Sequence, residues 1–194
     1  MKTKPNLRPR FPSLQPVEIW ILAAGLSSRM GRDKTRLRLG GRTLLGHILA
    51  TARATGLPAR VNRVDLVPRR GPLGGVYSAL ATSRAETILF LSCDMPFIST
   101  DLLNTLFHRL ARRKTALFVK DNGRIGFPFL LRRAALPVLE RQMTTRQFSL
   151  HQLARSLHAQ TVTLPRCQTR ELFNINTPKD WKIAQVQWHS MRGR

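Results

Sequence analysis

The chain has few acidic residues, few cysteines and a single tyrosine, and these shortages narrow the kind of protein that it encodes. Ten Asp and Glu stand against 33 Lys and Arg, which gives a formal net charge of +23 over 194 residues. Such an excess favours anionic partners, among them nucleotides, phosphorylated metabolites and nucleic acids. The arginines are scattered along the chain, however, and one Tyr with three Trp offers few rings on which bases could stack. Specific binding of nucleic acid is therefore not expected.

Cys93 and Cys167 are too few for a disulfide framework. No apolar run approaches the length of a membrane span, and no secretory segment precedes the first expected strand. These features predict a cytoplasmic protein without a membrane partner. With 42% hydrophobic residues the chain can bury one sizeable core. We expect one domain over residues 17–188, after a disordered, basic and proline-rich tail at 1–16 and before a basic tail at 189–194.

Segments typical of strands alternate with segments typical of helices. Short apolar runs predict strands at residues 17–24, 87–92, 115–120 and 161–165. Apolar residues at helical spacing, with capping residues and Pro178 at a first turn, predict helices at 43–55, 99–113, 134–143 and 149–157 and from 177 onward. The alternation predicts an α/β fold, a Rossmann-like three-layer sandwich around a mostly parallel sheet.

The segment after the first expected strand has the composition of a phosphate-binding loop. In α/β sheets, ligands lie beyond the carboxyl ends of the strands. Gly25 lets a backbone approach phosphate oxygens closely, and Arg29 and Lys34 supply positive charge. The spacing is neither that of a Walker A loop nor that of GxGxxG. The segment can hold a triphosphate, and a solvated turn is the alternative interpretation of its cations.

A carboxylate, Asp94, follows the strand expected at 87–92. Mg²⁺ commonly binds one or two carboxylates, and phosphate oxygens and water complete its shell. We therefore predict that Asp94 anchors Mg²⁺ against the phosphates of a nucleotide. The alternative is that Asp94 caps the helix expected at 99–113. The glycine-rich segment RGPLGG at 70–75 precedes a helical stretch and favours a backbone loop near a substrate.

Four segments, in this order, resemble the molybdenum cofactor guanylyltransferases and their nucleotidyltransferase relatives. LAAGLSSRMGRDK at 22–34 is similar to LAGGxSxRMGxDK, RGPLGGVYSAL at 70–80 to GPLxGI, CDMPFI at 93–98 to CDxPF, and FNINTPKDW at 173–181 to NINTPEDL. The resemblance implies transfer of GMP from GTP to molybdopterin that carries molybdenum, with pyrophosphate as the leaving group and Mg²⁺ as the cofactor. It also implies molybdoenzymes or cofactor-insertion proteins as further partners.

The same resemblance assigns roles to individual residues. It implies a nucleotide side made of Leu22, Ala23, Ala24, Gly25, Lys34, Asp65 and Asp94. Lys34, Arg29 and Asp94 would be the catalytic residues, with Asp94 as the metal ligand. Asn174 and Asn176 would face the acceptor.

Two departures from the family pattern leave other functions open. Ala24 stands where the guanylyl branch usually has a second glycine, and alanine is common in related cytidylyl and sugar-nucleotide enzymes. The family normally has a complete strand, helix and strand where this chain has only LPARVNRVD at 57–65, so about one β-α unit is expected to be missing. Asn62, in this short segment, is the candidate for the family's base-side Asn. A nucleotidyltransferase that uses CTP or a sugar phosphate is therefore one alternative. An inactive homologue that binds nucleotide or cofactor is another.

Overall fold

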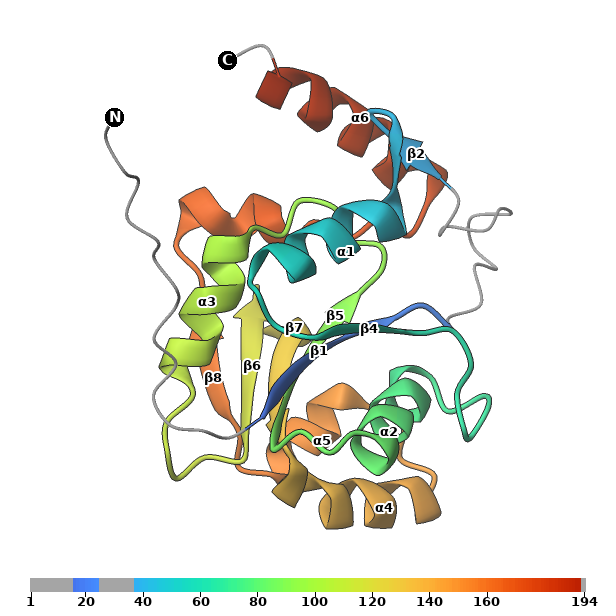
Figure 1. Cartoon of the computed structure of the whole chain (residues 1–194), viewed down its shortest axis with the longest axis vertical. Coiled ribbons are helices and arrows are strands. Elements are labelled where there is room, and N and C mark those ends of the chain that lie inside the picture. The colour runs from blue at the N-terminus through green and yellow to red at the C-terminus, as the bar shows by residue number, and fades with distance from the viewer. Residues whose placement is uncertain (1–15, 25–36, 193–194) are drawn as a thin grey trace, which may run out of the picture.

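A computed structural model describes residues 16–24 and 37–192, which form three layers (Figure 1). The middle layer is a six-stranded sheet whose strands are, in spatial order, β4 (Ala59–Asn62), β1 (Val17–Leu22), β5 (Thr87–Ser92), β7 (Arg124–Arg132), β6 (Ala116–Asp121) and β8 (Gln160–Thr163). One face is covered by α1 (Leu44–Ala54) and α3 (Thr100–Arg109). The other face is covered by α2 (Pro72–Thr82), α4 (Leu136–Thr144) and α5 (Leu150–Ser156).

The sheet is mostly parallel, as the sequence predicts. β1 pairs in parallel with β4 and β5, and β6 pairs in parallel with β8. Because β7 is antiparallel to both β5 and β6, the other strands of the sheet all share one direction. The α/β sandwich is therefore confirmed, and one edge of the sheet collects the carboxyl ends of every strand but β7.

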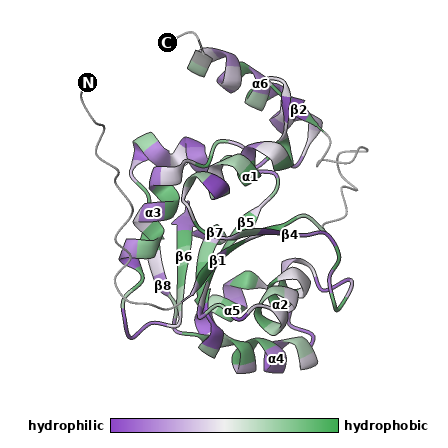
Figure 2. Ribbon diagram, viewed as in Figure 1, coloured by the Kyte–Doolittle hydropathy of each residue, from purple (hydrophilic) through white to green (hydrophobic). Residues whose placement is uncertain are grey.

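Alternate residues of the central strands enter two separate cores. Ile19 and Ile21 of β1 pack in one cluster with Ile48 of α1, whereas Trp20 packs in the other cluster with Val76 of α2. A strand that is covered on both faces is apolar at nearly every position. Figure 2 shows this as hydrophobic colour along the strands between the helical layers.

A smaller apolar cluster joins the start and the end of the chain. The hairpin of β2 (Arg38–Leu39) and β3 (Arg42–Thr43) contacts α6 (Pro178–Arg192) beyond one edge of the sandwich (Figure 1). Leu39 and Leu44 are buried there with Ile175 and Ala184. Leu37, the first described residue after the expected phosphate-binding segment, packs against this cluster.

The expected helices are confirmed, with small shifts at their ends. Thr43 caps α1, where its hydroxyl accepts a hydrogen bond from the N–H of Gly46 (3.0 Å). α6 continues to Arg192, so residues 189–192 are helical although they were expected in a C-terminal tail. Residues 1–15 of the expected N-terminal tail lie outside the described part of the chain. Within that part, no helix combines the length and the apolar character needed to cross a bilayer.

Strand β7 lies where the sequence predicts no strand. Its sequence, RIGFPFLLR, contains Pro128, which has no N–H to donate to a ladder. The register against β6 shifts at this point, because Phe118 pairs with Phe129 and Val119 pairs with Gly126. Pro128 therefore falls in an irregular stretch of the ladder. A short 3₁₀ helix, η2 (Arg133–Ala135), connects β7 to α4, and a second, η3 (Arg166–Leu172), follows β8.

The sequence analysis also did not predict strand β4, which lies in the shortened segment. Between α1 and α2 the chain forms only this strand and the connection 63–71. The strand pairs with β1 and forms one edge of the sheet. This arrangement agrees with the expected loss of about one β-α unit.

Glu18 ties β1 to its surroundings on the β4 side. Its carboxylate accepts hydrogen bonds from Trp20 Nε1 (2.8 Å), Ser83 Oγ (2.9 Å) and Arg60 Nε (3.2 Å). Burial raises the pKa of Glu18, but these hydrogen bonds and the charge of Arg60 outweigh burial and hold the pKa below its ordinary value of 4.5. The ionised carboxylate therefore stabilises the folded state.

Glu18→Gln is expected to lower the free energy of unfolding by about 1–2 kcal/mol at pH 7, because an amide accepts weaker hydrogen bonds than a carboxylate does. A lowered pKa in the folded state gives a stabilisation that is complete above pH 4.5 and lost as the pH falls through the folded-state pKa. Urea unfolding at pH 7 and near pH 3.5 measures this, with the exposed Glu140→Gln as control. A difference from the parent that is the same at both pH values would contradict the assignment.

Candidate nucleotide and acceptor sites

The backbone after β1 is held between the segments that follow β4 and β5. The N–H of Ala23 donates to the carbonyl of Asn62 (2.8 Å), and the N–H of Cys93 donates to the carbonyl of Leu22 (3.3 Å). The next two strands of this sheet along the chain, β4 and β5, lie on opposite sides of β1. In open α/β sheets, ligands bind beyond the carboxyl ends of the strands where the strand order reverses in this way. Leu22, Ala23 and Ala24, which are expected to border the base, are half-buried there.

Two glycines let α2 begin directly against these strand ends. A Cβ at Gly75 would lie 3.0 Å from Leu22 Cδ2 and 3.1 Å from Asn62 Nδ2. A Cβ at Gly74 would lie 2.8 Å from both Asp65 Oδ2 and the carbonyl oxygen of Val67. The first turn of α2 has no acidic residue and no side-chain cap. Its N–H groups and the positive end of its dipole therefore suit an anionic ligand.

The shortened segment brings Asn62 and Asp65 into contact. Asn62 Nδ2 donates to Asp65 Oδ1 at 2.7 Å, and Asn62 is only 7% exposed. Burial raises the pKa of Asp65, and the hydrogen bond from Asn62 offsets part of this rise. The residue expected to contact the nucleoside thus lies beside the candidate for the base-side Asn, next to the start of α2.

Gly74→Ala is expected to weaken the binding of GTP by roughly 10-fold to 100-fold, because the added Cβ must displace the connection that carries Asp65. Gly126→Ala is the matched control, since a Cβ there meets no atom within 4 Å. Calorimetric titration with Mg²⁺ and GTP measures the effect, and thermal unfolding checks the fold. Parent-like affinity in Gly74→Ala would show that the first turn of α2 does not border the nucleotide.

Asp94 lies at the carboxyl end of β5 and is 8% exposed. Its Oδ1 accepts a hydrogen bond from Ser92 Oγ (2.5 Å), and its carbonyl accepts one from the N–H of Ile175 (3.0 Å). The N-cap of α3 is Ser99, whose hydroxyl accepts from the N–H of Leu102 (3.1 Å). Asp94 is therefore not the N-cap of α3, and its backbone joins the β5 loop to the loop before α6.

The donors around Asp94 suit a magnesium ion that is shared with a phosphorylated substrate. No three His, Cys, Asp or Glu side chains gather at one point in residues 16–24 and 37–192. A complete metal cage of protein side chains is thus absent from these residues. Mg²⁺ needs no such cage, because phosphate oxygens and water supply most of its ligands. Asp94 fits the single protein carboxylate of such a site.

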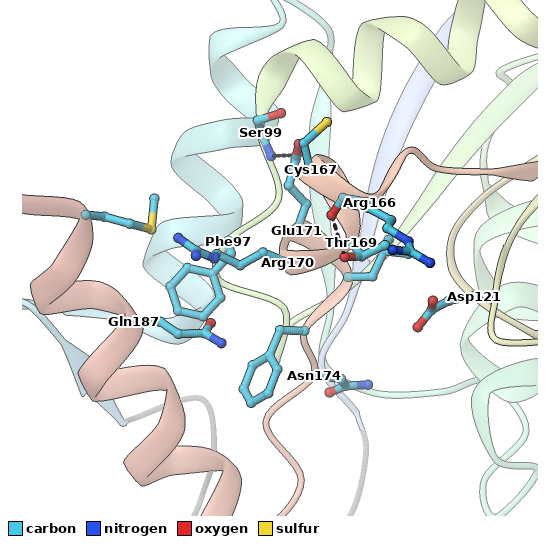
Figure 3. A pocket seen from close by; sticks show the side chains of 13 residues that line it. Phe97, Ser99, Asp121, Arg166, Cys167, Thr169, Arg170, Glu171, Asn174 and Gln187 are labelled. Carbon is cyan, nitrogen blue, oxygen red and sulfur yellow. Dashed lines mark hydrogen bonds between the residues drawn. The ribbon is translucent and has the colours of Figure 1, made fainter. Parts of the chain in front are cut away.

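Two hollows are lined in part by residues of the loop that follows Asp94. The larger, of about 860 Å³, lies between Phe97, η3 and α6 (Figure 3). The smaller, of about 440 Å³, lies between Met95 and the turn from β6 to β7. Asp121, Leu172 and Asn174 line both hollows. The two hollows therefore meet beside these residues.

The two asparagines expected on the acceptor side have different surroundings. Asn174 lines both hollows, and its Oδ1 is buried without a hydrogen-bond partner among the residues that the structure describes. The backbone N–H groups of Asn176 and Thr177 donate to Asp180 Oδ2 (3.0 and 2.8 Å). The backbone of Asn176 thus supports the start of α6, and Asn174 is the residue of the pair that lines the hollows.

Gly25, Arg29 and Lys34 lie outside the described residues, so their roles stay predictions. The sequence reasoning missed Asp121 altogether. The one available signal was its position directly after the strand expected at 115–120, at the same edge of the sheet as Asp94. No familiar motif contains it.

Comparisons with known proteins identify the family of this chain. Residues 19–162 match the family described as MobA-like NTP transferase domain. A molybdenum cofactor guanylyltransferase of Xanthomonas euvesicatoria is 35% identical over 176 residues, which cover 83% of this chain and 90% of the relative. Another, of Rhizobium leguminosarum, is 32% identical over 200 residues, which cover 89% and 93%.

Solved structures show the same fold at lower identity. Molybdopterin-guanine dinucleotide biosynthesis protein A of Archaeoglobus fulgidus superposes with a TM-score of 0.74 at 20% identity, covering 89% of this chain and 99% of that one. A 4-diphosphocytidyl-2C-methyl-D-erythritol synthase of Anaerococcus prevotii superposes with a TM-score of 0.69 at 15% identity, covering 90% and 99%. The fold is thus shared by a protein whose name refers to guanine and a protein whose name refers to a cytidyl group.

Proposed function

This chain belongs to the MobA-like NTP transferase family, and we propose that it transfers the GMP moiety of GTP to molybdopterin that carries molybdenum and releases pyrophosphate. The observation that carries the proposal is the similarity to relatives named molybdenum cofactor guanylyltransferase at 35% and 32% identity over most of both chains. The name of these relatives is the reason for proposing guanine as the base and the molybdenum cofactor as the acceptor. The arrangement of the site supplies the rest of the argument.

The site divides into a nucleotide side and an acceptor side, with Asp94 between them. The ends of β1 and β4 and the first turn of α2 surround the nucleotide. The two hollows beside Asn174 receive the acceptor. A phosphate oxygen of the acceptor attacks the α-phosphorus of GTP in line, and the bond to pyrophosphate breaks on the opposite side. Such a reaction depends on holding the two phosphates in register, which a rigid sheet edge provides.

Charge neutralisation is the second requirement of this reaction. The attacking phosphate is already ionised, so no general base is needed. We place Arg29 and Lys34 on the triphosphate, where they stabilise the charge that develops on pyrophosphate. Bound Mg²⁺, held by Asp94, would neutralise phosphate oxygens at the reaction centre. Asn62 and Asp65 contact the nucleoside, and Asn174 contacts the acceptor.

The direct test is release of pyrophosphate by the purified chain with Mg²⁺, molybdenum-loaded molybdopterin and each of GTP, CTP and ATP. Release that requires both GTP and the acceptor supports the proposal. Release with CTP or with a sugar phosphate would support the alternative that Ala24 leaves open. Binding without release would indicate an inactive homologue. We propose a cytoplasmic location, because two cysteines are too few for the disulfide framework that is typical of small secreted domains.

Asp94→Asn is expected to lower turnover by at least about 100-fold, because it removes the anionic metal ligand and keeps the shape of the side chain. The Asn carbonyl can still accept from Ser92, so thermal unfolding should stay close to that of the parent. Asp101→Asn, an exposed change in the first turn of α3, is the control. An Asp94→Asn protein with parent-like turnover and parent-like dependence on Mg²⁺ concentration would remove the metal assignment.

Lys34→Ala is expected to lower turnover by roughly 10²–10³-fold, the range for loss of one positioned charge-stabilising group. A lysine after a strand end contributes little to the core, so stability should be unchanged. Steady-state pyrophosphate release measures the effect, and Lys179→Ala on the exposed surface of α6 serves as the control. Turnover within twofold of the parent would show that another cation contacts the triphosphate.

A further inference from the structure

Asp121 lies where the two hollows meet, at the end of β6. The residue lines both of them and is half-buried. Asn174, which also lines both, directly precedes Ile175, whose N–H is bonded to the carbonyl of Asp94. A ligand held at Asp121 thus lies on the acceptor side of the proposed reaction centre.

Among the residues that the structure describes, the Asp121 carboxylate has no ion-pair partner, although two arginines lie near it. Arg124 lies across from it in the turn from β6 to β7, and Arg166 lines the larger hollow with it. Within residues 16–24 and 37–192, neither guanidinium forms an ion pair with Asp121, and no hydrogen bond holds its carboxylate. Glu171, the other acid of the larger hollow, accepts from the N–H of Ser99 (2.8 Å) (Figure 3). Of the two acids that line the larger hollow, Asp121 is therefore the one whose carboxylate oxygens have no protein partner among the described residues.

We propose that Asp121 recognises the edge of the acceptor's pterin ring formed by its 2-amino group and N3–H. The inference rests on the proposed function, which makes a pterin the acceptor. This edge presents two parallel N–H donors in one plane, and a carboxylate is the side chain that offers two parallel acceptors. Asn174, whose Oδ1 is buried without a hydrogen-bond partner among the described residues, lines the same junction.

This placement also explains why Asp121 lies at the proposed acceptor site. The protein is strongly basic and the acceptor is an anion, so an acid at this site needs a reason. The phosphate of the acceptor must lie at Asp94, and Met95, the next residue, lines the smaller hollow. The ring is the neutral end of the acceptor and carries the hydrogen-bond donors. A carboxylate at Asp121 therefore selects the orientation in which the ring points away from Asp94 and the phosphate points toward it.

Binding of two fluorescent probes to the full chain tests the proposal. The probes are 6-hydroxymethylpterin phosphate and the matching lumazine phosphate, in which a carbonyl replaces the 2-amino group. A bidentate contact of this kind predicts that the parent prefers the pterin by roughly 10-fold to 100-fold. Asp121→Asn should reduce this preference to about twofold or less, because an amide can also donate to the lumazine carbonyl. The affinity for GTP should stay within about twofold of the parent.

Glu171→Gln is the matched control, since it removes an equal charge from the larger hollow. Its preference for the pterin should equal that of the parent. The proposal is overturned if the parent does not discriminate between the probes, if Asp121→Asn keeps the preference, or if Glu171→Gln loses it equally. A parallel loss of GTP affinity would also overturn it, because guanine carries the same donor edge. If Asp121→Asn does not fold, Asp121→Glu should still prefer the pterin, and equal binding of both probes by this variant would count against the proposal.

Failure of this inference and failure of the proposed function give different results. A chain that releases pyrophosphate from GTP with molybdopterin but does not distinguish the two probes keeps the function and loses the role of Asp121. A chain that prefers the pterin but transfers no GMP keeps the role of Asp121 and loses the function.

Discussion

The close approach of α2 to the ends of β1 and β4 is the constraint on which the candidate site depends. A Cβ at position 74 would clash with Asp65 and with the backbone of Val67, and a Cβ at position 75 would crowd Leu22 and Asn62. The uncapped first turn of α2 lies beside the side chain of Leu22 and beside the Asn62–Asp65 pair. The same crossing places β5 on the other side of β1, so that Asp94 reaches the same edge. A larger residue at position 74 would have to displace the connection that carries Asp65, a residue expected to contact the nucleotide.

The shortened connection alters the edge of the sheet without removing the polar groups expected there. A missing β-α unit exposes β4 as an edge strand, and Val64 is 80% exposed in the connection that follows. Asn62 and Asp65, only three residues apart, nevertheless form a direct hydrogen bond. The Asp65 carboxylate is therefore still held beside Asn62 at the end of the edge strand β4.

The sequence predicted the parts of this protein whose signals are local. The strand at Val17 is apolar at nearly every position because it is covered on both faces. The start of α3 is visible as a pair of possible capping residues, Ser99 and Thr100, of which Ser99 is the N-cap. Strand β7 gives no such signal, because Pro128 and Gly126 interrupt it and its pairing with β5 and β6 is decided by distant residues. The site followed the same rule. Asp94 is part of a recognisable segment, whereas Asp121 gains its position only when β6, η3 and the loop before α6 come together.

Six of the ten acids of this basic chain form two groups that differ in their place in the fold. Glu18, Glu171 and Asp180 accept hydrogen bonds from the protein itself and hold segments together. Asp65, Asp94 and Asp121 follow or end the parallel strands β4, β5 and β6, at the one edge where ligands of such a sheet bind. In a chain with 33 cations, carboxylates at this edge weaken the attraction for phosphate. Their presence there is best explained by ligand groups that require an acceptor: a base or ribose, a metal ion, and the donor edge of a ring.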